Sequence, residues 1–320
     1  MEPAARFNKS TMTVGTAEYD RLLAEEIKKW SVDQTQNKGG WTSVRVNQIQ
    51  FRTYRRGTVE TQLEAIKKQG AKLQVLELGG SDGWFSNEIL RLPEIASVTA
   101  IDAALRSQIA QTYDSHVQTI AGDLNKIDKI VFFEKKATFD CILTRGTLHH
   151  LVNPKKTLEY AIDHLLTTGG IIIIDDTWTP NALQLKLNAF GFMLLGRIPQ
   201  HLVDWGKKRI VFSEMLRRLT ASLAQLITIP FSREKASRFA HNEDFSPFEG
   251  ISDASDYKNI YERKDIELIY FKNFAALPAL YHTYPARCKI IERLLFSIDT
   301  FLIKGGLMPG DFHVAILRKK

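Results

Sequence analysis

The segment Val75-Leu-Glu-Leu-Gly-Gly-Ser-Asp-Gly-Trp-Phe-Ser86 decides the fold of this chain. An apolar run leads into a turn that contains Gly79, Gly80 and Gly83, and a helix pattern then continues until Pro93. Glycine lets a turn adopt backbone conformations that other residues avoid, and it lets a ligand approach the main chain closely. The free N–H groups at the start of the helix favour polar or anionic groups. The segment therefore predicts a strand, a ligand-binding turn and a helix.

Further apolar, β-branched runs lie on both sides of this segment and are separated by stretches of helix length. This alternation predicts βα units and a parallel sheet. A helix is expected over Thr61–Gln69, closed by Gly70, and another over Lys289–Leu302. Residues 177–262 break the rhythm and have the pattern of helices and linkers. The expected strands are Leu73–Leu78, Val98–Ile101, Val117–Ile120, Phe139–Leu143, Gly170–Ile174, Ile266–Phe271 and Phe312–Leu317.

The composition is that of a folded globular protein. The chain has 320 residues, of which 44% are apolar and 25% charged, so disorder is excluded as the main state. This length allows two domains, or one domain with a large insertion. Two cysteines exclude a disulfide scaffold and indicate a reducing compartment. The sequence shows no secretory signal and no apolar run long enough for a membrane span, so we expect a cytoplasmic protein.

The net charge of +7 allows an anionic partner, but it also fits an ordinary basic protein. It therefore does not decide between the classes of partner.

Acidic residues follow the expected strands that neighbour the glycine turn. Asp102, with Ala103 beside it, comes 19 positions after Gly83, where an acid accepts hydrogen bonds from ribose hydroxyls. Asp123-Leu124 follows the next strand, and we expect Asp123 to accept from an adenine amino group. Parallel strands place their carboxyl ends at one edge, so Glu77 should face the same crevice.

The order of residues in the turn excludes two common nucleotide sites. The order Glu77-x-Gly79-x-Ser81-x-Gly83 lacks the G-x-G-x-x-G spacing of dinucleotide sites, and its acid would repel a phosphate. A phosphate-binding Walker loop needs a Gly-Lys-Ser/Thr sequence after the turn, which this chain lacks. The expected ligand is a nucleoside without phosphate, able to carry a positive charge.

The segment resembles motif I of class I S-adenosylmethionine-dependent methyltransferases, E/D-x-G-x-G-x-G, with Ser81 at the middle glycine. Residues 139–154 resemble the fourth strand of that family and the following loop with its L-H-H sequence. Residues 165–174 resemble its double glycine and fifth strand, and residues 312–317 its antiparallel last strand. The resemblance covers residues 73–176 and 264–319. It implies an α/β, Rossmann-like, doubly wound seven-stranded sheet with an antiparallel last strand.

The resemblance also implies S-adenosylmethionine as cofactor, S-adenosylhomocysteine as product, and a set of binding residues. Thr144 and Arg145, after the fourth strand, are expected on the methionine side of the cofactor. The implied cofactor-binding residues are Glu77, Gly79, Gly80, Ser81, Gly83, Asp102, Ala103, Asp123, Leu124, Thr144 and Arg145.

Two histidines, His149 and His150, are the candidates for the catalytic base. Histidine has a pKa near neutrality and suits the removal of a proton from an acceptor hydroxyl. Neighbouring residues point in different directions, so at most one of them is expected to act. The family pattern favours His150, and the alternative is that neither is the base and one packs on the following helix.

Substrate contacts are expected from Asp175, Trp178, His241 and Arg55. Asp175-Asp176 could also cap the strand end or hold a divalent metal as in catechol-type enzymes, but the loop Thr144-Arg145-Gly146 lacks the second acid, so no metal is expected.

The expected organisation is an N-terminal helical lid (1–72), a first core part (73–176), a helical substrate-cap insertion (177–262) and the last core strands (263–320). The predicted function is methyl transfer to a small molecule, and the expected acceptor is a hydroxyl of a secondary metabolite, lipid or sugar-containing compound. Two alternatives stay open, a nucleic-acid methyltransferase and a protein that binds S-adenosylmethionine without methyl transfer. Nucleic acid is not expected, because no Asn/Asp-Pro-Pro-Tyr/Phe sequence follows the fourth strand.

Overall fold

The structure is a computed structural model of the chain and describes residues 12–36, 59–80, 83–104, 114, 116–134, 138–177, 254–274, 297–298, 300–305 and 312–320. The strands are β1 (Leu73–Leu78), β2 (Ile95–Asp102), β3 (Val117–Ala121), β4 (Phe139–Arg145), β5 (Leu166–Thr177), β6 (Ile266–Phe274) and β7 (Phe312–Lys319). The helices are α1 (Ala17–Gln36), α4 (Glu60–Lys67), α5 (Trp84–Leu90), η3 (Leu124–Lys129), α6 (Val131–Glu134), η4 (Leu148–His150), α7 (Pro154–Tyr160), η5 (Ala161–Leu165) and α11 (Ala254–Tyr261).

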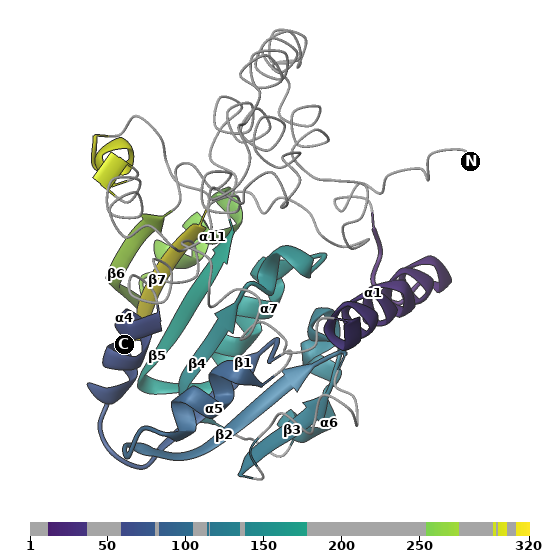
Figure 1. Cartoon of the computed structure of the whole chain (residues 1–320), viewed down its shortest axis with the longest axis horizontal. Helices are drawn as coiled ribbons and strands as arrows, with labels where there is room; N and C mark the ends of the chain where they lie inside the picture. Colours follow the sequence, from purple (N-terminus) through teal and green to yellow (C-terminus); the bar gives the residue numbers. More distant parts are fainter. Residues whose placement is uncertain are drawn as a thin grey trace, which may run out of the picture.

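The seven strands form one sheet in the order β3-β2-β1-β4-β5-β7-β6. The pairs from β3 to β5 are parallel, and β7 runs antiparallel between β5 and β6. Figure 1 shows this sheet with helices in front of and behind it. The sequence-based prediction of a seven-stranded sheet with an antiparallel last strand is therefore confirmed.

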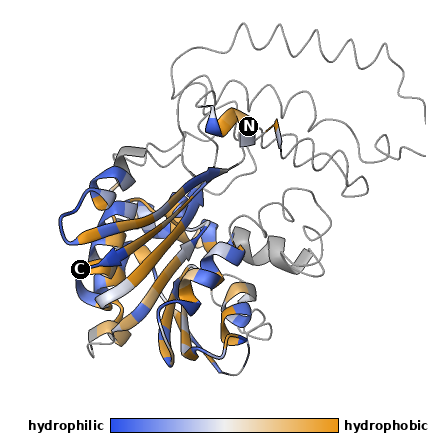
Figure 2. Cartoon of the chain, turned by 90° about the vertical axis from the view of Figure 1, so that its left-hand side faces the viewer, coloured by the Kyte–Doolittle hydropathy of each residue, from blue (hydrophilic) through white to orange (hydrophobic). Residues whose placement is uncertain are grey.

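The central strands are buried on both faces, which explains their nearly continuous apolar sequences. One face contributes Leu76, Leu78 and Ile142 to an apolar cluster, and the other contributes Val75 and Leu143 to a second cluster. Figure 2 shows the apolar stripes along the middle of the sheet. The alternation of side chains along each strand thus separates the core into two layers.

Helices complete both layers. Ile66 of α4 and Ile89 of α5 belong to the same cluster as Val75. Leu158 of α7, Ile162 of η5 and Ile260 of α11 pack in the cluster on the opposite face. The sheet is therefore doubly wound, as the resemblance implied.

The boundaries of some elements differ from those expected. β5 begins at Leu166, where it pairs with Phe139, and is longer than the expected Gly170–Ile174. α4 ends at Lys67, so that Gly70, with φ of 130°, follows a short turn instead of closing the helix directly. α5 ends at Leu90, before the expected stop at Pro93. Residues 297–298 and 300–304, inside the expected helix Lys289–Leu302 and just beyond it, are helical.

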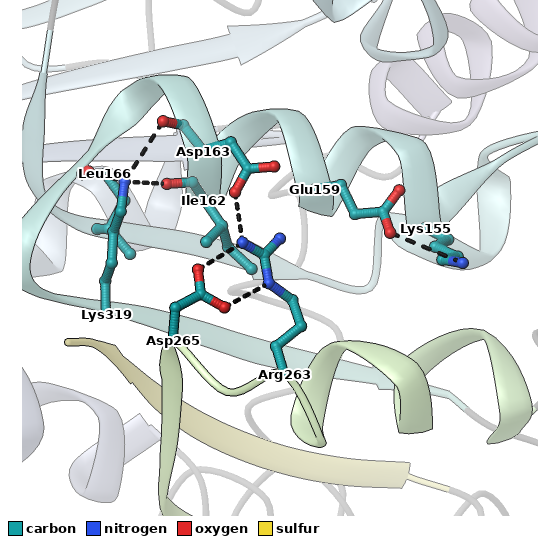
Figure 3. A network of polar contacts seen from close by, with 8 residues as sticks. All are labelled: Lys155, Glu159, Ile162, Asp163, Leu166, Arg263, Asp265 and Lys319. Carbon is teal, nitrogen blue, oxygen red and sulfur yellow. Dashed lines mark hydrogen bonds and ion pairs between the residues drawn. The ribbon is translucent and has the colours of Figure 1, made fainter.

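A polar network joins the amino end of β5 to the neighbouring strands, away from the carboxyl edge (Figure 3). Arg263, which follows α11, pairs with Asp163 of η5 and, at 2.6 Å, with Asp265 before β6. The Lys319 ammonium donates to the carbonyl oxygens of Ile162 and Leu166 at 2.6 and 3.0 Å. These contacts tie β6 and β7 to the parallel part of the sheet.

The four-part division of the chain stays a prediction. Most of the insertion 177–262 lies outside the described residues, whereas α11 at its end packs on the sheet core. In the N-terminal part, Ile66 of α4 is fully buried in the core. No helix among the described residues is both long and apolar enough to cross a membrane.

Candidate active site

The acids expected at the cofactor site lie at the carboxyl ends of three neighbouring parallel strands, or just after them. The register pairs Leu78 of β1 with Ile101 of β2, and Asp102 of β2 with Ala121 of β3. Glu77, Asp102 and Asp123 are therefore placed at one edge of the sheet, as the sequence predicted.

The glycine turn is fastened to β2 and to the loop after β4. The N–H groups of Gly79 and Gly80 both donate to the carbonyl of Ile101, at 2.7 and 3.2 Å. Gly79 and Gly83 have φ values of 81° and 72°, in the left-handed region that favours glycine. A Cβ on Gly79 would lie 2.0 Å from Oγ1 of Thr147, so no larger residue fits without movement. The turn consequently brings bare main chain to the carboxyl edge.

The carboxylates at this edge are held by local donors. Asp102 accepts the N–H of Ala104 at Oδ1, at 2.7 Å. Asp123 accepts the N–H of Asn125 at Oδ1, at 3.0 Å, and begins the helical turn η3. Glu77 is buried and accepts a hydrogen bond from the hydroxyl of Ser86 in α5. Such oriented acids beside a bare glycine turn suit a nucleoside, whose hydroxyl and amino groups are donors, so the residues present fit S-adenosylmethionine.

The end of β4 places Thr144 and Arg145 at the same edge. Thr144 is fully buried, and its hydroxyl has no hydrogen-bond partner among the described residues. The Arg145 guanidinium lies 4.0 Å from the centre of the Phe85 ring, and its Nε donates to Asp175 at 3.4 Å. Gln62 of α4 donates to the same Asp175 oxygen at 2.7 Å. Asp175 is 1% exposed and is thus held by protein donors, and its predicted contact with substrate stays a prediction.

His149 is fixed by the buried carboxylate of Asp176. Its Nδ1 lies 2.6 Å from Oδ1 of Asp176, while Oδ2 accepts the N–H groups of Thr147 and Leu148 at 3.1 and 2.6 Å. Burial raises the pKa of Asp176, but the opposing effects of His149, His313 and the Leu148 N–H leave it below its usual value. Asp176 is therefore an anion that orients both the loop after β4 and the His149 ring.

His150 contacts a different acid. Its Nδ1 lies 2.9 Å from Oε1 of Glu26 in α1, and both side chains are largely buried. The ring centroids of His149 and His150 are nevertheless only 4.1 Å apart, at an interplanar angle of 43°. The two histidines thus form a contacting pair, although each is held by its own carboxylate.

An aromatic cluster surrounds the buried His313 next to Asp176. His313 of β7 is the register partner of Asp176. Its Nε2 and the Tyr261 hydroxyl form a hydrogen bond of 2.8 Å. Burial lowers the pKa of His313 to about 4, although Asp176 acts in the opposite direction. His313 is therefore neutral near pH 7 and packs against Tyr257 and Phe271.

The structure does not test every predicted site residue. Leu124 is buried and Ala103 follows Asp102 at the sheet edge. No three His, Cys, Asp or Glu side chains are grouped for metal binding in the part of the chain that the structure describes. Ser81, Trp178, His241 and Arg55 lie outside the described residues.

Sequence reasoning missed several residues that hold this site. Tyr19 contacts Asp123, and Glu26 contacts His150. In each pair the two residues are more than 100 positions apart in the sequence. Gln62 and His313 are also distant in sequence, and no local pattern marks them. The pair Asp175-Asp176 was visible, but only the strand geometry shows that Asp176 faces the histidines.

A family model described as a methyltransferase domain matches residues 50–250. The chain belongs to this methyltransferase-domain family. It is an S-adenosylmethionine-dependent methyltransferase, which confirms the class that the sequence motifs indicated. No curated protein sequence matches the chain significantly.

Solved structures of methyltransferases match the chain at low sequence identity. The plantazolicin methyltransferase BpumL in complex with S-adenosylhomocysteine is 15% identical, with a TM-score of 0.42 over 94% of this chain and 98% of that chain. The N-methyltransferase NodS from Bradyrhizobium japonicum WM9, also in complex with S-adenosylhomocysteine, is 18% identical, with a TM-score of 0.36 over 48% of this chain and 74% of that chain.

Proposed function

We propose that this methyltransferase acts on a small molecule and transfers the methyl group to a hydroxyl, with His149 as the general base. The observation that carries the proposal is the contact of His149 Nδ1 with the buried anion of Asp176. A carboxylate at Nδ1 fixes that proton and leaves Nε2 as the atom that accepts a proton. This pairing is the arrangement that makes a histidine an oriented base.

The cofactor is proposed to bind along the carboxyl edge of β1, β2, β3 and β4. In this arrangement Asp102 accepts the ribose hydroxyls and Asp123 accepts the adenine amino group. Gly79, Gly80 and Gly83 allow close approach of the main chain, with Ser81, Ala103 and Leu124 beside them. Glu77, Thr144 and Arg145 complete the methionine side of the site. Bound S-adenosylmethionine supplies an electrophilic methyl group on a sulfonium.

The protein contributes alignment and proton removal. The acceptor oxygen forms its bond to the methyl carbon as the methyl–sulfur bond breaks, and S-adenosylhomocysteine leaves. The hydroxyl proton passes to Nε2 of His149, while Asp176 stabilises the imidazolium that results. No further redox or metal chemistry is required for this balance.

The geometry favours His149 over His150 as the base. Asp176 accepts two backbone N–H groups as well as the His149 ring, so its position is fixed by the sheet and the loop together. Glu26, the partner of His150, comes instead from the N-terminal helix α1. Asp175, Trp178, His241 and Arg55 stay candidate substrate contacts, with the N-terminal zone as lid and residues 177–262 as cap.

The test is a transfer assay with methyl-labelled S-adenosylmethionine and three acceptor pools, namely hydroxylated small molecules, RNA and protein. We expect label only in the first pool, and His149→Gln should lower kcat by about 10²–10⁴-fold. His116→Gln, at an exposed histidine before β3, is the matched control and should keep full activity. Label in RNA or protein, or an active His149→Gln enzyme, would contradict the proposal.

A further inference from the structure

Helix α1 contacts the predicted cofactor site and the histidine pair with one face. Tyr19, Leu22 and Glu26 occupy positions i, i+3 and i+7, which lie on one side of a helix and span two turns, about 10.5 Å. Figure 1 shows α1 beside the carboxyl ends of the strands. Leu22 is 2% exposed and packs in an apolar cluster with Val14 and Val152, which follows the histidine loop. The helix is thus seated between the two sites.

Tyr19 holds the acid that is proposed to bind adenine. Its hydroxyl donates to Oδ2 of Asp123 at 2.6 Å, and the Tyr19 side chain is fully buried. Burial and the bond to Asp123 raise the pKa of Tyr19 far above its usual value, so the phenol remains a donor. The Lys126 ammonium of η3 lies 5.0 Å above the Tyr19 ring, and it pairs with Asp20 of α1 at 3.2 Å.

With Asn125 N–H on Oδ1 and Tyr19 on Oδ2, the Asp123 carboxylate is fixed at both oxygens. Each carboxylate oxygen has two acceptor positions, so a second donor can still bind. The contact with Tyr19 therefore orients Asp123 without using up its capacity for an amino group.

Glu26, two turns further along α1, contacts His150. Glu26 is 7% exposed, and Oε1 of its carboxylate lies 2.9 Å from Nδ1 of His150. A carboxylate only accepts, so a neutral His150 carries its proton on Nδ1. The His150 ring in turn packs against His149 at 4.1 Å between centroids.

We propose that α1 supplies two positioning residues, Tyr19 for Asp123 at the adenine end and Glu26 for His150 at the acceptor end. The inference rests on the proposed function, because it assigns adenine to Asp123 and the acceptor to the histidine pair. Neither residue needs to touch a reacting atom. Both act by fixing the orientation of a side chain that binds the ligand or contacts the base.

The adenine end is tested by titration calorimetry of the full chain with S-adenosylhomocysteine. Tyr19→Phe removes only the hydroxyl, and we expect Kd to rise about fivefold. Glu25→Ala is the matched control, because Glu25 lies on the same helix in an exposed ion pair with Arg21. An unchanged or lower Kd for Tyr19→Phe would overturn this part. An unchanged Kd would show that the Tyr19 hydroxyl does not contribute to binding, and a lower Kd would show that it competes with adenine for Asp123.

The acceptor end is tested by ¹⁵N NMR of the His150 ring, assigned with His150→Gln. In the native protein at neutral pH we expect the proton on Nδ1, and in Glu26→Ala on Nε2, the preferred tautomer of a free imidazole. Glu26→Gln retains an acceptor oxygen and should restore the native signal, while Glu25→Ala leaves it unchanged. The same tautomer in native protein and Glu26→Ala, with native circular dichroism, would overturn this part.

Different results would overturn the proposed cofactor site and the proposed role of α1. If the native protein does not bind S-adenosylhomocysteine, the proposed arrangement of the cofactor site is wrong. If it binds, but Tyr19→Phe and Glu26→Ala behave as Glu25→Ala does, only the role of α1 is wrong.

Discussion

Thr147 occupies the space that a side chain on Gly79 would need. A Cβ built on Gly79 would lie 2.0 Å from Thr147 Oγ1 and 2.4 Å from its Cγ2. Thr147 is itself held by Asp176, which accepts its N–H group. The glycine turn and the loop after β4 are therefore interlocked, and a change in one must move the other.

Gly79→Ala should destabilise the protein more than Gly169→Ala, although the two glycines have the same left-handed backbone. Gly169 has nearly the same φ, 82° against 81°, but open space around its Cβ position. Gly169→Ala should cost about 1–2 kcal/mol of unfolding free energy, the cost of left-handed backbone alone. Gly79→Ala should cost more, because the clash with Thr147 adds to this, and it should weaken S-adenosylhomocysteine binding. Equal losses of unfolding free energy for the two variants, measured by urea unfolding, would show that Thr147 moves aside at no cost and would contradict this prediction.

Asp176→Asn should destabilise the fold through the loop after β4. The carboxylate accepts two backbone N–H groups and His149, whereas an amide offers one acceptor oxygen and leaves a buried donor unpaired. We expect a loss of about 2–4 kcal/mol in unfolding free energy. Asp140→Asn is the control, because Asp140 accepts one N–H, that of Gln74, at a more exposed position. Similar losses for both variants would contradict the central role of Asp176.

His313 predicts a specific acid dependence of stability. Its folded pKa is about 4, below the usual value of 6.5, because burial disfavours the charged ring. The unfolded chain therefore binds more protons between these pH values, so stability falls as pH drops through this window, by about 3 kcal/mol in total. Well above pH 6.5 the residue is neutral in both states and adds no slope.

His313→Gln removes this titration and should flatten the pH dependence of unfolding between pH 6.5 and 4. The measurement is guanidinium unfolding at a series of pH values for both proteins. Parallel curves for the two proteins would mean that His313 titrates normally in the fold.

The sheet could be predicted from the sequence because each buried strand carries its own local signal. Leu73–Leu78 was predicted to the residue, since a mostly apolar run ends at a glycine turn. The start of β5 was missed, because Leu166 to Gly169 are not an apolar run and join the sheet by pairing with β4. Main-chain pairing does not depend on side-chain type, so such extensions leave little trace in the sequence.

Some residues of the candidate site could also be predicted from the sequence, and others could not. Asp102 and Asp123 follow strand ends, and topology alone brings them together at one edge. Tyr19 and Glu26 reach the site from a helix far away in sequence, and only tertiary packing aligns them with Asp123 and His150. The sequence shows the histidine pair as L-H-H, but it does not show which carboxylate holds each ring, because Asp176 and Glu26 meet the rings only in the folded structure.

The most direct test of the cofactor site is calorimetric titration with S-adenosylmethionine and S-adenosylhomocysteine of the native protein, Asp102→Ala and Asp114→Ala. Asp114 is an exposed acid before β3 and serves as the control. We predict micromolar binding by the native protein and Asp114→Ala, and at least about a tenfold higher Kd for Asp102→Ala, which loses charge-assisted hydrogen bonds to ribose. Native protein that binds neither compound, or Asp102→Ala that binds both as tightly as the control, would contradict this assignment.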